Sequence, residues 1–205
     1  MLASSSPRRR EILEGAGFQV ALVTPGPEQE PAKGEEPKGY VLGQSRAKAL
    51  GAEVEGRSGV LLSGDTVVSL DGGILGKPED AEEARAMLQK LMGRRHEVWS
   101  ALAMGRVEGG RLCSQGLVCG ARCAQVHFGE IPEEALEAYL AGEEWKDKAG
   151  GYGIQAWAGA FASLVEGRLD TVVGLPMDLF WALWKELGAG EDPDEPLRRS
   201  SWPRS

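Results

Sequence analysis

The sequence predicts an α/β domain built on a mixed β-sheet. Segments with helical periodicity alternate along the chain with apolar runs typical of strands. Some neighbouring strand segments are joined by glycine turns and others are separated by helices, so both hairpins and crossovers are expected. The 205 residues suffice for one domain or two closely joined lobes, and the 29 glycines fall between periodic segments, where they mark turns.

The first part of the chain is expected to form a short strand, two helices and a hairpin. Pro7 suits a first helical position, and Gly15 or Gly17 would close that helix. Asp-Gly-Gly at residues 71–73 is a hairpin signal that leads into a second apolar segment. In order, the expected elements are a strand ending at residues 2–3, a helix at 7–13, a Pro/Gly/Glu-rich surface loop at 24–39, a helix at 40–50 and a buried strand at 60–70.

The second part of the chain continues the alternation. Asp80 is placed to cap a helix that ends at Gly93, because an apolar face recurs behind it at helical spacing. The following elements are expected to be strands at 96–107 and 117–128 joined across Gly109-Gly110, a helix from Pro132 to about residue 140, strands at 161–165 and 171–173, and a last helix at 176–187. The polar, proline-broken tail at 188–205 is predicted to be disordered, which leaves one domain at 1–187.

Composition excludes several classes of function. Asp and Glu total 31 against 23 Lys and Arg, giving a formal charge of -8, which argues against a general binder of nucleic acid or anionic membranes. A local basic pocket stays open. No apolar run could span a bilayer and no secretory signal is visible, so a cytoplasmic protein is expected.

The three cysteines, Cys113, Cys119 and Cys123, do not have the spacing of a zinc site. Cys119, Cys123 and His127 would share one face of a strand at period two. No metal role is expected for them.

The motif SSSPRRR follows the first strand directly. Ser6 suits the N-cap, which leaves Arg8 and Arg9 in the first helical turn, where the helix dipole disfavours cations. Hydroxyls of Ser4 and Ser6, free amides and guanidinium groups together resemble the phosphate sites found at helix N-termini. A solvated basic turn is the alternative, but the coincidence of three serines, a proline and paired arginines favours phosphate.

Two further segments carry candidate residues. Asp65 stands within an apolar strand, so it either has a chemical role or is a satisfied structural carboxylate. Lys77 lies at a rigid Gly-Lys-Pro turn just beyond the hairpin. Residues 142–155 pack charges of both signs against small residues, which suits a loop that approaches a ligand, and the amide of Gln155 could read the edge of a base.

Taken together, these residues resemble the Maf family of nucleoside-triphosphate pyrophosphatases. The resemblance covers residues 2 to about 187 through six blocks in register: LASSSPRR at the start, GDTVV at 64–68, GKP at 76–78, H-x-V at 96–98, DKAG-x-YGIQ at 147–155 and VVGLP at 172–176. It implies an elongated mixed sheet with flanking helices and a central cleft, similar to the fold of inosine-triphosphate pyrophosphatases. It also implies hydrolysis of a nucleoside triphosphate to the monophosphate and pyrophosphate.

The resemblance also implies roles for individual residues. Asp65 matches the family's proton acceptor, and Arg8, Thr66 and Gln155 match positions that go with dTTP and UTP as substrates. Arg9, Lys48, Lys77 and Lys148 match basic positions around the phosphates, beside Ser4 and Ser6. A divalent cation, Mg²⁺ or Mn²⁺, is implied as cofactor, with Asp65 and Asp147 as ligands and one of Glu28, Gln29 or Glu30 at the family's acidic position. A homodimer is a family-level expectation.

Other functions remain open at this stage. The first alternative is a nucleotide-binding inhibitor of septum formation without turnover. The second is a pyrophosphatase for purine triphosphates or 7-methyl-GTP. Asp65 could orient or deprotonate the water, or hold the metal that does so.

Overall fold

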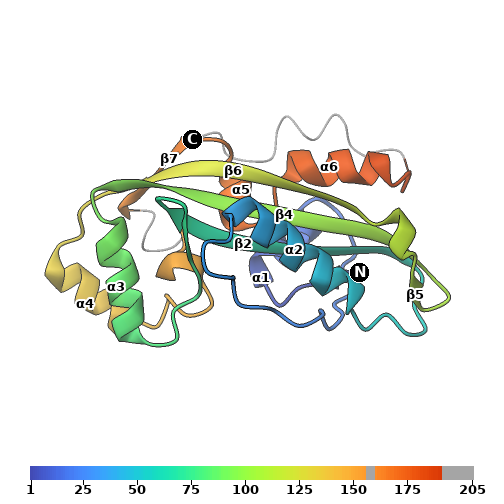
Figure 1. Cartoon of the computed structure of the whole chain (residues 1–205), viewed down its shortest axis with the longest axis horizontal. Coiled ribbons are helices and arrows are strands. Elements are labelled where there is room, and N and C mark those ends of the chain that lie inside the picture. Colours follow the sequence, from blue (N-terminus) through green and yellow to red (C-terminus); the bar gives the residue numbers. More distant parts are fainter. Residues whose placement is uncertain (156–159, 191–205) are drawn as a thin grey trace.

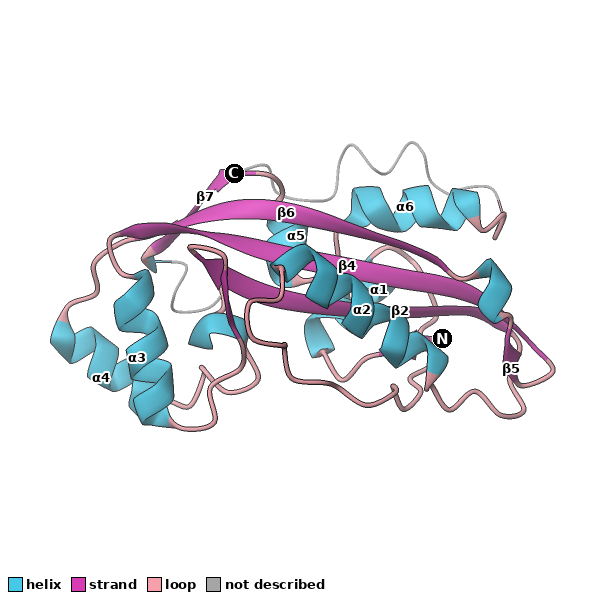
Figure 2. Cartoon of the chain, in the orientation of Figure 1, coloured by secondary structure: helices cyan, strands magenta, loops and turns pink. Residues whose placement is uncertain are grey.

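The computed structural model describes residues 1–155 and 160–190, and these form a mixed α/β domain around a seven-stranded sheet (Figures 1 and 2). The strand order is β1-β2-β4-β6-β7, with β3 paired to β2 and β5 paired to β4. β1 runs parallel to β2 and the other pairs are antiparallel. The predicted mixed sheet is therefore confirmed.

The strands differ greatly in length. Three long ones form the centre of the sheet, and they are β2 (Gly59–Leu70), β4 (Arg94–Glu108) and β6 (Val118–Phe128). The shorter ones are β1 (Leu2–Ala3), β3 (Gly73–Leu75), β5 (Arg111–Leu112) and β7 (Ala162–Glu166). The turn between β2 and β3 consists of Asp71 and Gly72, both at positive φ, as its sequence predicted.

The helices lie on both sides of this sheet. They are α1 (Pro7–Gly15), α2 (Pro37–Leu50), α3 (Ala81–Leu91), α4 (Glu133–Ala141), α5 (Leu169–Val173) and α6 (Met177–Glu186). Figure 1 places α3 and α4 together at one end of the elongated sheet. None of the helices in the described part of the chain is long and apolar enough to cross a membrane.

The alternation of β2 sends successive side chains to opposite faces of the sheet. Leu61 and Val67 pack with residues of α2, whereas Leu62 packs with α1 and α6. As a result Asp65 points to the side of α2 and Thr66 points to the side of α1 and α5.

One edge of β2 is only partly covered. On this edge β1 pairs with residues 62 and 63, and β3 pairs with residues 68 to 70. Among the described residues, positions 64–67 have no strand partner on that side. This gap holds the Gly-Asp-Thr sequence, of which Asp65 and Thr66 line a cleft.

Three sequence predictions of local structure are wrong. Residues 171–173 were expected as a strand but belong to helix α5, because Gly174 at φ 110 caps them and donates to the carbonyl groups of Asp170 and Thr171. The Gly109-Gly110 turn joins β4 to β5, and β6 follows only after a 3₁₀ turn at Ser114–Gly116. Helix α2 starts at Pro37, so the surface loop is shorter than expected.

The remaining local predictions are less informative about function. Cys119, Cys123 and His127 lie on one face of β6, in the stretch that pairs with β4. Cys113, Cys119 and Cys123 are all free thiols. Of the predicted disordered tail, Gly188 belongs to the turn after α6, Ala189 and Gly190 follow without regular structure, and the rest lies outside the described residues.

Candidate active site

A cleft of about 620 Å³ opens at the uncovered stretch of β2. Its walls come from the loop after β1, helices α1 and α2, the turn after β3 and the segment after α4. It gathers all the site residues predicted from sequence: Ser4, Ser6, Arg8, Arg9, Lys48, Asp65, Thr66, Lys77, Asp147, Lys148 and Gln155.

The cleft has the opposite charge to the chain as a whole. Among the lining residues that the structure describes, six are cationic and three are carboxylates, whereas the whole sequence has a formal charge of -8. Lys146 is one of the six and was not predicted from sequence; it pairs with Glu143 on the surface. Such a concentration of cations in a concave site favours a polyanionic ligand.

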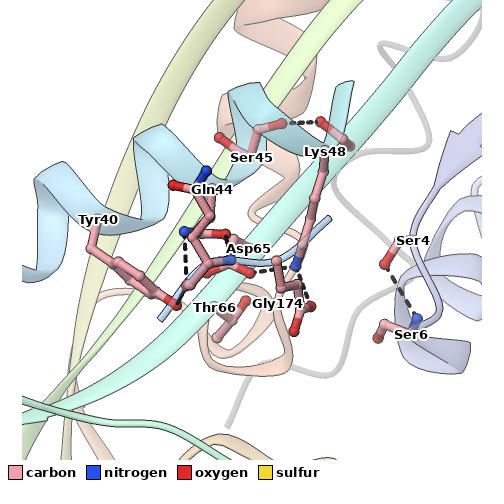
Figure 3. Close-up of polar contacts among 12 residues, drawn as sticks. Ser4, Ser6, Tyr40, Gln44, Ser45, Lys48, Asp65, Thr66 and Gly174 are labelled. Atoms are coloured by element: carbon pink, nitrogen blue, oxygen red, sulfur yellow. Dashed lines mark hydrogen bonds and ion pairs between the residues drawn. The ribbon is translucent and has the colours of Figure 1, made fainter. Parts of the chain in front are cut away.

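Asp65 belongs to a chain of ion pairs on the α2 side of the cleft. Lys48, which is buried, donates to Asp65 Oδ1 at 2.6 Å and also contacts Glu28 Oε1 at 2.6 Å (Figure 3). Lys77 contacts the other oxygen of Glu28 at 3.5 Å. Partial burial opposes it, but Lys48 and Lys77 together hold the pKa of Glu28 below its usual value.

The three candidates for the acidic loop position lie in different places. Glu28 enters the cleft, Gln29 is held through its backbone, and Glu30 is exposed outside it. No sequence signal distinguishes the three, because the choice depends on how the loop lies against α2.

Arg9 has a different environment from that expected for a phosphate ligand. It is buried, and its guanidinium donates to Gly174 O at 2.8 Å, to Ser4 Oγ at 2.9 Å and to Thr66 Oγ1 at 2.9 Å. It therefore joins the loop after β1, strand β2 and the end of α5, while adding positive charge to the wall. Its contact with phosphate stays a prediction.

Thr66 and the serines of the first loop are also oriented by protein contacts. Thr66 Oγ1 lies 2.8 Å from Ser100 Oγ, and Ser100 donates to Thr171 O at 2.7 Å. Ser4 Oγ accepts from the backbone N–H of Ser6 at 3.2 Å. Ser6 stands at the N-cap of α1 as predicted, but its side chain makes no capping bond and faces the cleft.

The guanidinium group of Arg8 has a donor available to a ligand. It lines the cleft, its Nε is buried, and that atom has no hydrogen-bond partner among the described residues. Burial lowers the pKa of Arg8, and the nearby Glu11, Tyr139 and Asp147 oppose this shift. An anionic ligand would satisfy both the charge and the donor.

The segment after α4 forms the opposite wall. Gly150 and Gly151 have φ of 68° and 73°, and the Gly150 N–H donates to Gly76 O at 2.8 Å, which ties this wall to the turn of Lys77. Lys148 donates to Glu144 O, and burial followed by repulsion from Arg8 lowers its pKa. Gln155 lies exposed at the edge of the cleft.

A buried aromatic contact fixes this wall. His96 Nε2 lies 2.5 Å from the hydroxyl of Tyr152, and Tyr139 donates to Gly151 O at 2.8 Å. Burial, then repulsion from His127, lowers the pKa of His96 to about 4. His96 and Tyr152 stand in the H-x-V and YGIQ blocks of the sequence, but no periodicity indicated that these two residues are in contact.

The carboxylates suit a divalent cation. Asp65 and Glu28 converge on one lysine nitrogen, so their oxygens lie within one small region of the cleft. Mg²⁺ is commonly held by one or two carboxylates together with phosphate oxygens and water. In the described part of the chain no group of three or more His, Cys, Asp or Glu could hold a metal by itself, so the substrate would have to complete the coordination. A ligand role for Asp147 stays a prediction.

Comparison with known proteins supplies the remaining evidence. The sequence profile of Maf-like proteins matches residues 1–187. The chain is 43% identical over 178 residues to a dTTP/UTP pyrophosphatase of Cereibacter sphaeroides, covering 86% of this chain and 88% of that protein. It is 38% identical over 177 residues to the dTTP/UTP pyrophosphatase of Pyrococcus furiosus, covering 86% and 89%. The enzyme of the same name from Pyrococcus abyssi is 40% identical over 185 residues, covering 90% and 94%.

Proposed function

The chain belongs to the Maf-like protein family, and on this premise we propose that it hydrolyses dTTP and UTP to the nucleoside monophosphate and pyrophosphate. The observation that carries the proposal is the cleft itself. It gathers Arg8, Thr66 and Gln155, which match the positions that go with these substrates, around an excess of cations suited to a triphosphate. The names of the relatives agree with this reaction.

The chemical problem is attack by water on a phosphorus surrounded by negative oxygens, with pyrophosphate leaving. Arg8, Lys77 and Lys148 line the cleft and offset charge on the phosphates and the leaving group. Asp65, held by Lys48, orients the attacking water and accepts its proton, or would hold a divalent cation that would supply the activation of the water.

Base selection falls to two residues that act differently. The hydroxyl of Thr66 is already engaged by Arg9 and Ser100, so Thr66 shapes the wall against which the base lies. Gln155 is exposed at the cleft and can both donate to and accept from a pyrimidine edge. A base that left this amide unpaired would bind less well.

A divalent cation, Mg²⁺ or Mn²⁺, is part of the proposal. Asp65 and Glu28 are the residues that would hold it, and when bound it would neutralise phosphate charge. A homodimeric state remains a prediction of the family resemblance, and a cytoplasmic location remains a prediction from the sequence.

Release of pyrophosphate from a panel of nucleotides, with and without Mg²⁺ or Mn²⁺, tests the proposal. We expect turnover of dTTP and UTP that depends on the cation. Equal or better turnover of GTP or 7-methyl-GTP would contradict the substrate assignment. Tight nucleotide binding without release of pyrophosphate would instead support the regulatory alternative.

A further inference from the structure

The loop that brings Glu28 to the cleft is held against helix α2 at two points. The first is Gly26, whose N–H donates to Lys48 O at 3.0 Å. A Cβ at this position would lie 2.5 Å from Ala47 O and 2.9 Å from the Cα of Gly51, so only glycine allows the loop to approach this closely.

The second point is a clamp on the backbone of Gln29. The buried amide of Gln44 accepts from the Gln29 N–H at 3.0 Å and donates to the Gln29 carbonyl at 3.0 Å. Tyr40 donates to the same carbonyl at 2.8 Å. The side chain of Gln29 is exposed, so α2 holds this residue through its backbone.

The clamp and the central lysine share one face of α2. Tyr40, Gln44 and Lys48 are spaced four residues apart and point to the same side of the helix (Figure 3). Glu28 lies directly before the clamped residue, so the helix fixes the distance between the Glu28 backbone and Lys48.

The ion pairs of Glu28 are too weak to hold the loop by themselves. The side chain of Glu28 is 53% exposed, and that of Lys77 is 47% exposed. Ion pairs with an exposed partner contribute little, because water and salt screen them. The amide of Gln44 is buried and makes two hydrogen bonds to the Gln29 backbone, so this partly buried contact is the stronger restraint.

We propose that Gln44, assisted by Tyr40, is a positioning residue that places Glu28 in the active site. The inference rests on the proposed function, in which Glu28 acts beside Asp65 on the phosphates and their cation. It assigns a functional role to an uncharged residue of α2 that lies outside the cleft.

The test compares Gln44→Met, which keeps the size of the side chain but makes neither hydrogen bond, with Glu28→Gln. We expect each to lower kcat/KM for dTTP by roughly tenfold. The double variant should lose no more than the larger single loss, because Gln44 acts through Glu28. Losses that multiply would overturn the proposal.

Two matched controls separate the clamp from general effects of the loop. Gln29→Ala removes a side chain that the clamp does not use, and Glu30→Gln removes the same charge as Glu28→Gln from a neighbouring position. Both should stay within about twofold of the wild type. A tenfold loss in Gln29→Ala would show that the backbone contact is not what matters.

A readout independent of turnover completes the design. Hydrogen exchange of the Gln29 amide should be slow in the wild type and faster in Gln44→Met, at matched thermal stability, and unchanged exchange would refute the clamp. If Gln44→Met does not fold, Tyr40→Phe serves instead, with a smaller loss of roughly threefold, and wild-type activity in that variant counts against the proposal. An inactive wild-type protein would refute the proposed function, whereas active wild type with active Gln44→Met refutes only this inference.

Discussion

Arg8, Arg9 and Arg10 are consecutive in α1 but lie in three different environments. Replacing each in turn by alanine therefore compares three roles of arginine within one turn of the helix. Arg8 lines the cleft, and its buried Nε has no hydrogen-bond partner in the part of the chain that the structure describes. Arg9 is buried with three acceptors. Arg10 is exposed and pairs with Glu14 at 2.7 Å.

Arg8→Ala should reduce activity without reducing stability. The substitution leaves no acceptor in the described part of the protein without its donor, so the free energy of unfolding should change by less than about 0.5 kcal/mol. Loss of a charge-assisted bond to phosphate costs about 1.5 to 3 kcal/mol, which corresponds to roughly a tenfold to more than a hundredfold fall in kcat/KM.

Arg9→Ala should reduce both activity and stability. Three bonds from a buried guanidinium disappear, and Gly174 O loses its donor in the interior, for a cost on the order of 3 kcal/mol. For a chain of this length that lowers Tm by on the order of 10 °C. Activity should fall as well, because Thr66 and the first loop lose their common support.

Arg10→Ala should change neither property much. An exposed pair four residues apart on a helix contributes about 0.3 to 0.5 kcal/mol. The three variants should be compared by thermal unfolding and by pyrophosphate release at one ionic strength. Equal losses of kcat/KM in the Arg8 and Arg10 variants, or an unchanged Tm in the Arg9 variant, would refute the geometry described for this helix.

Asp65→Asn should lower kcat by roughly a hundredfold or more while nucleotide still binds, because the amide cannot accept a proton or act as an anionic ligand; near-normal kcat in the folded variant would remove Asp65 from the mechanism. The pKa of His96 is lowered from 6.5 to about 4 in the folded protein. The free energy of unfolding should therefore fall as the pH drops from 6.5 to 4, because the unfolded chain takes up the proton first. The loss should approach about 3 kcal/mol near pH 4, and His96→Gln should lack it; equal pH profiles of unfolding free energy would contradict the assignment. Gly26→Ala should cost about 1 to 3 kcal/mol and lower kcat/KM, because its Cβ meets the backbone of α2, and an unchanged Tm would show that the loop can move aside.

Some of the residues that sequence reasoning found were visible because they conflict with their local environment. Asp65 interrupts an apolar strand, and Arg8 stands in a helical turn that disfavours a cation, and such conflicts are detectable over a few residues. Lys77 has no such conflict and was found through the GKP block of the family resemblance. All of these residues line the cleft.

The features that sequence reasoning missed depend on contacts between distant segments. The position of Glu28 is decided by an amide of α2 that lies 15 residues beyond Gln29 in the chain. The valines of α5 have a preference for strands, but the turn at Gly174 and the bonds of Asp170 to Arg168 and Met177 override it. No short-range pattern contains that information.

The hydrogen bond from Arg9 to Gly174 joins residues that are 165 positions apart in the chain. It can form only after Gly174 has been synthesised. During synthesis the first loop leaves the ribosome long before Gly174 exists, and the Arg9 guanidinium stays hydrated until the C-terminal part of the chain returns to it. Contacts between such distant residues slow folding, because closing a long loop costs chain entropy. The cleft is therefore complete only after residues 172–174 have been synthesised and lie against the first loop, so a shorter nascent chain lacks part of the wall of the cleft.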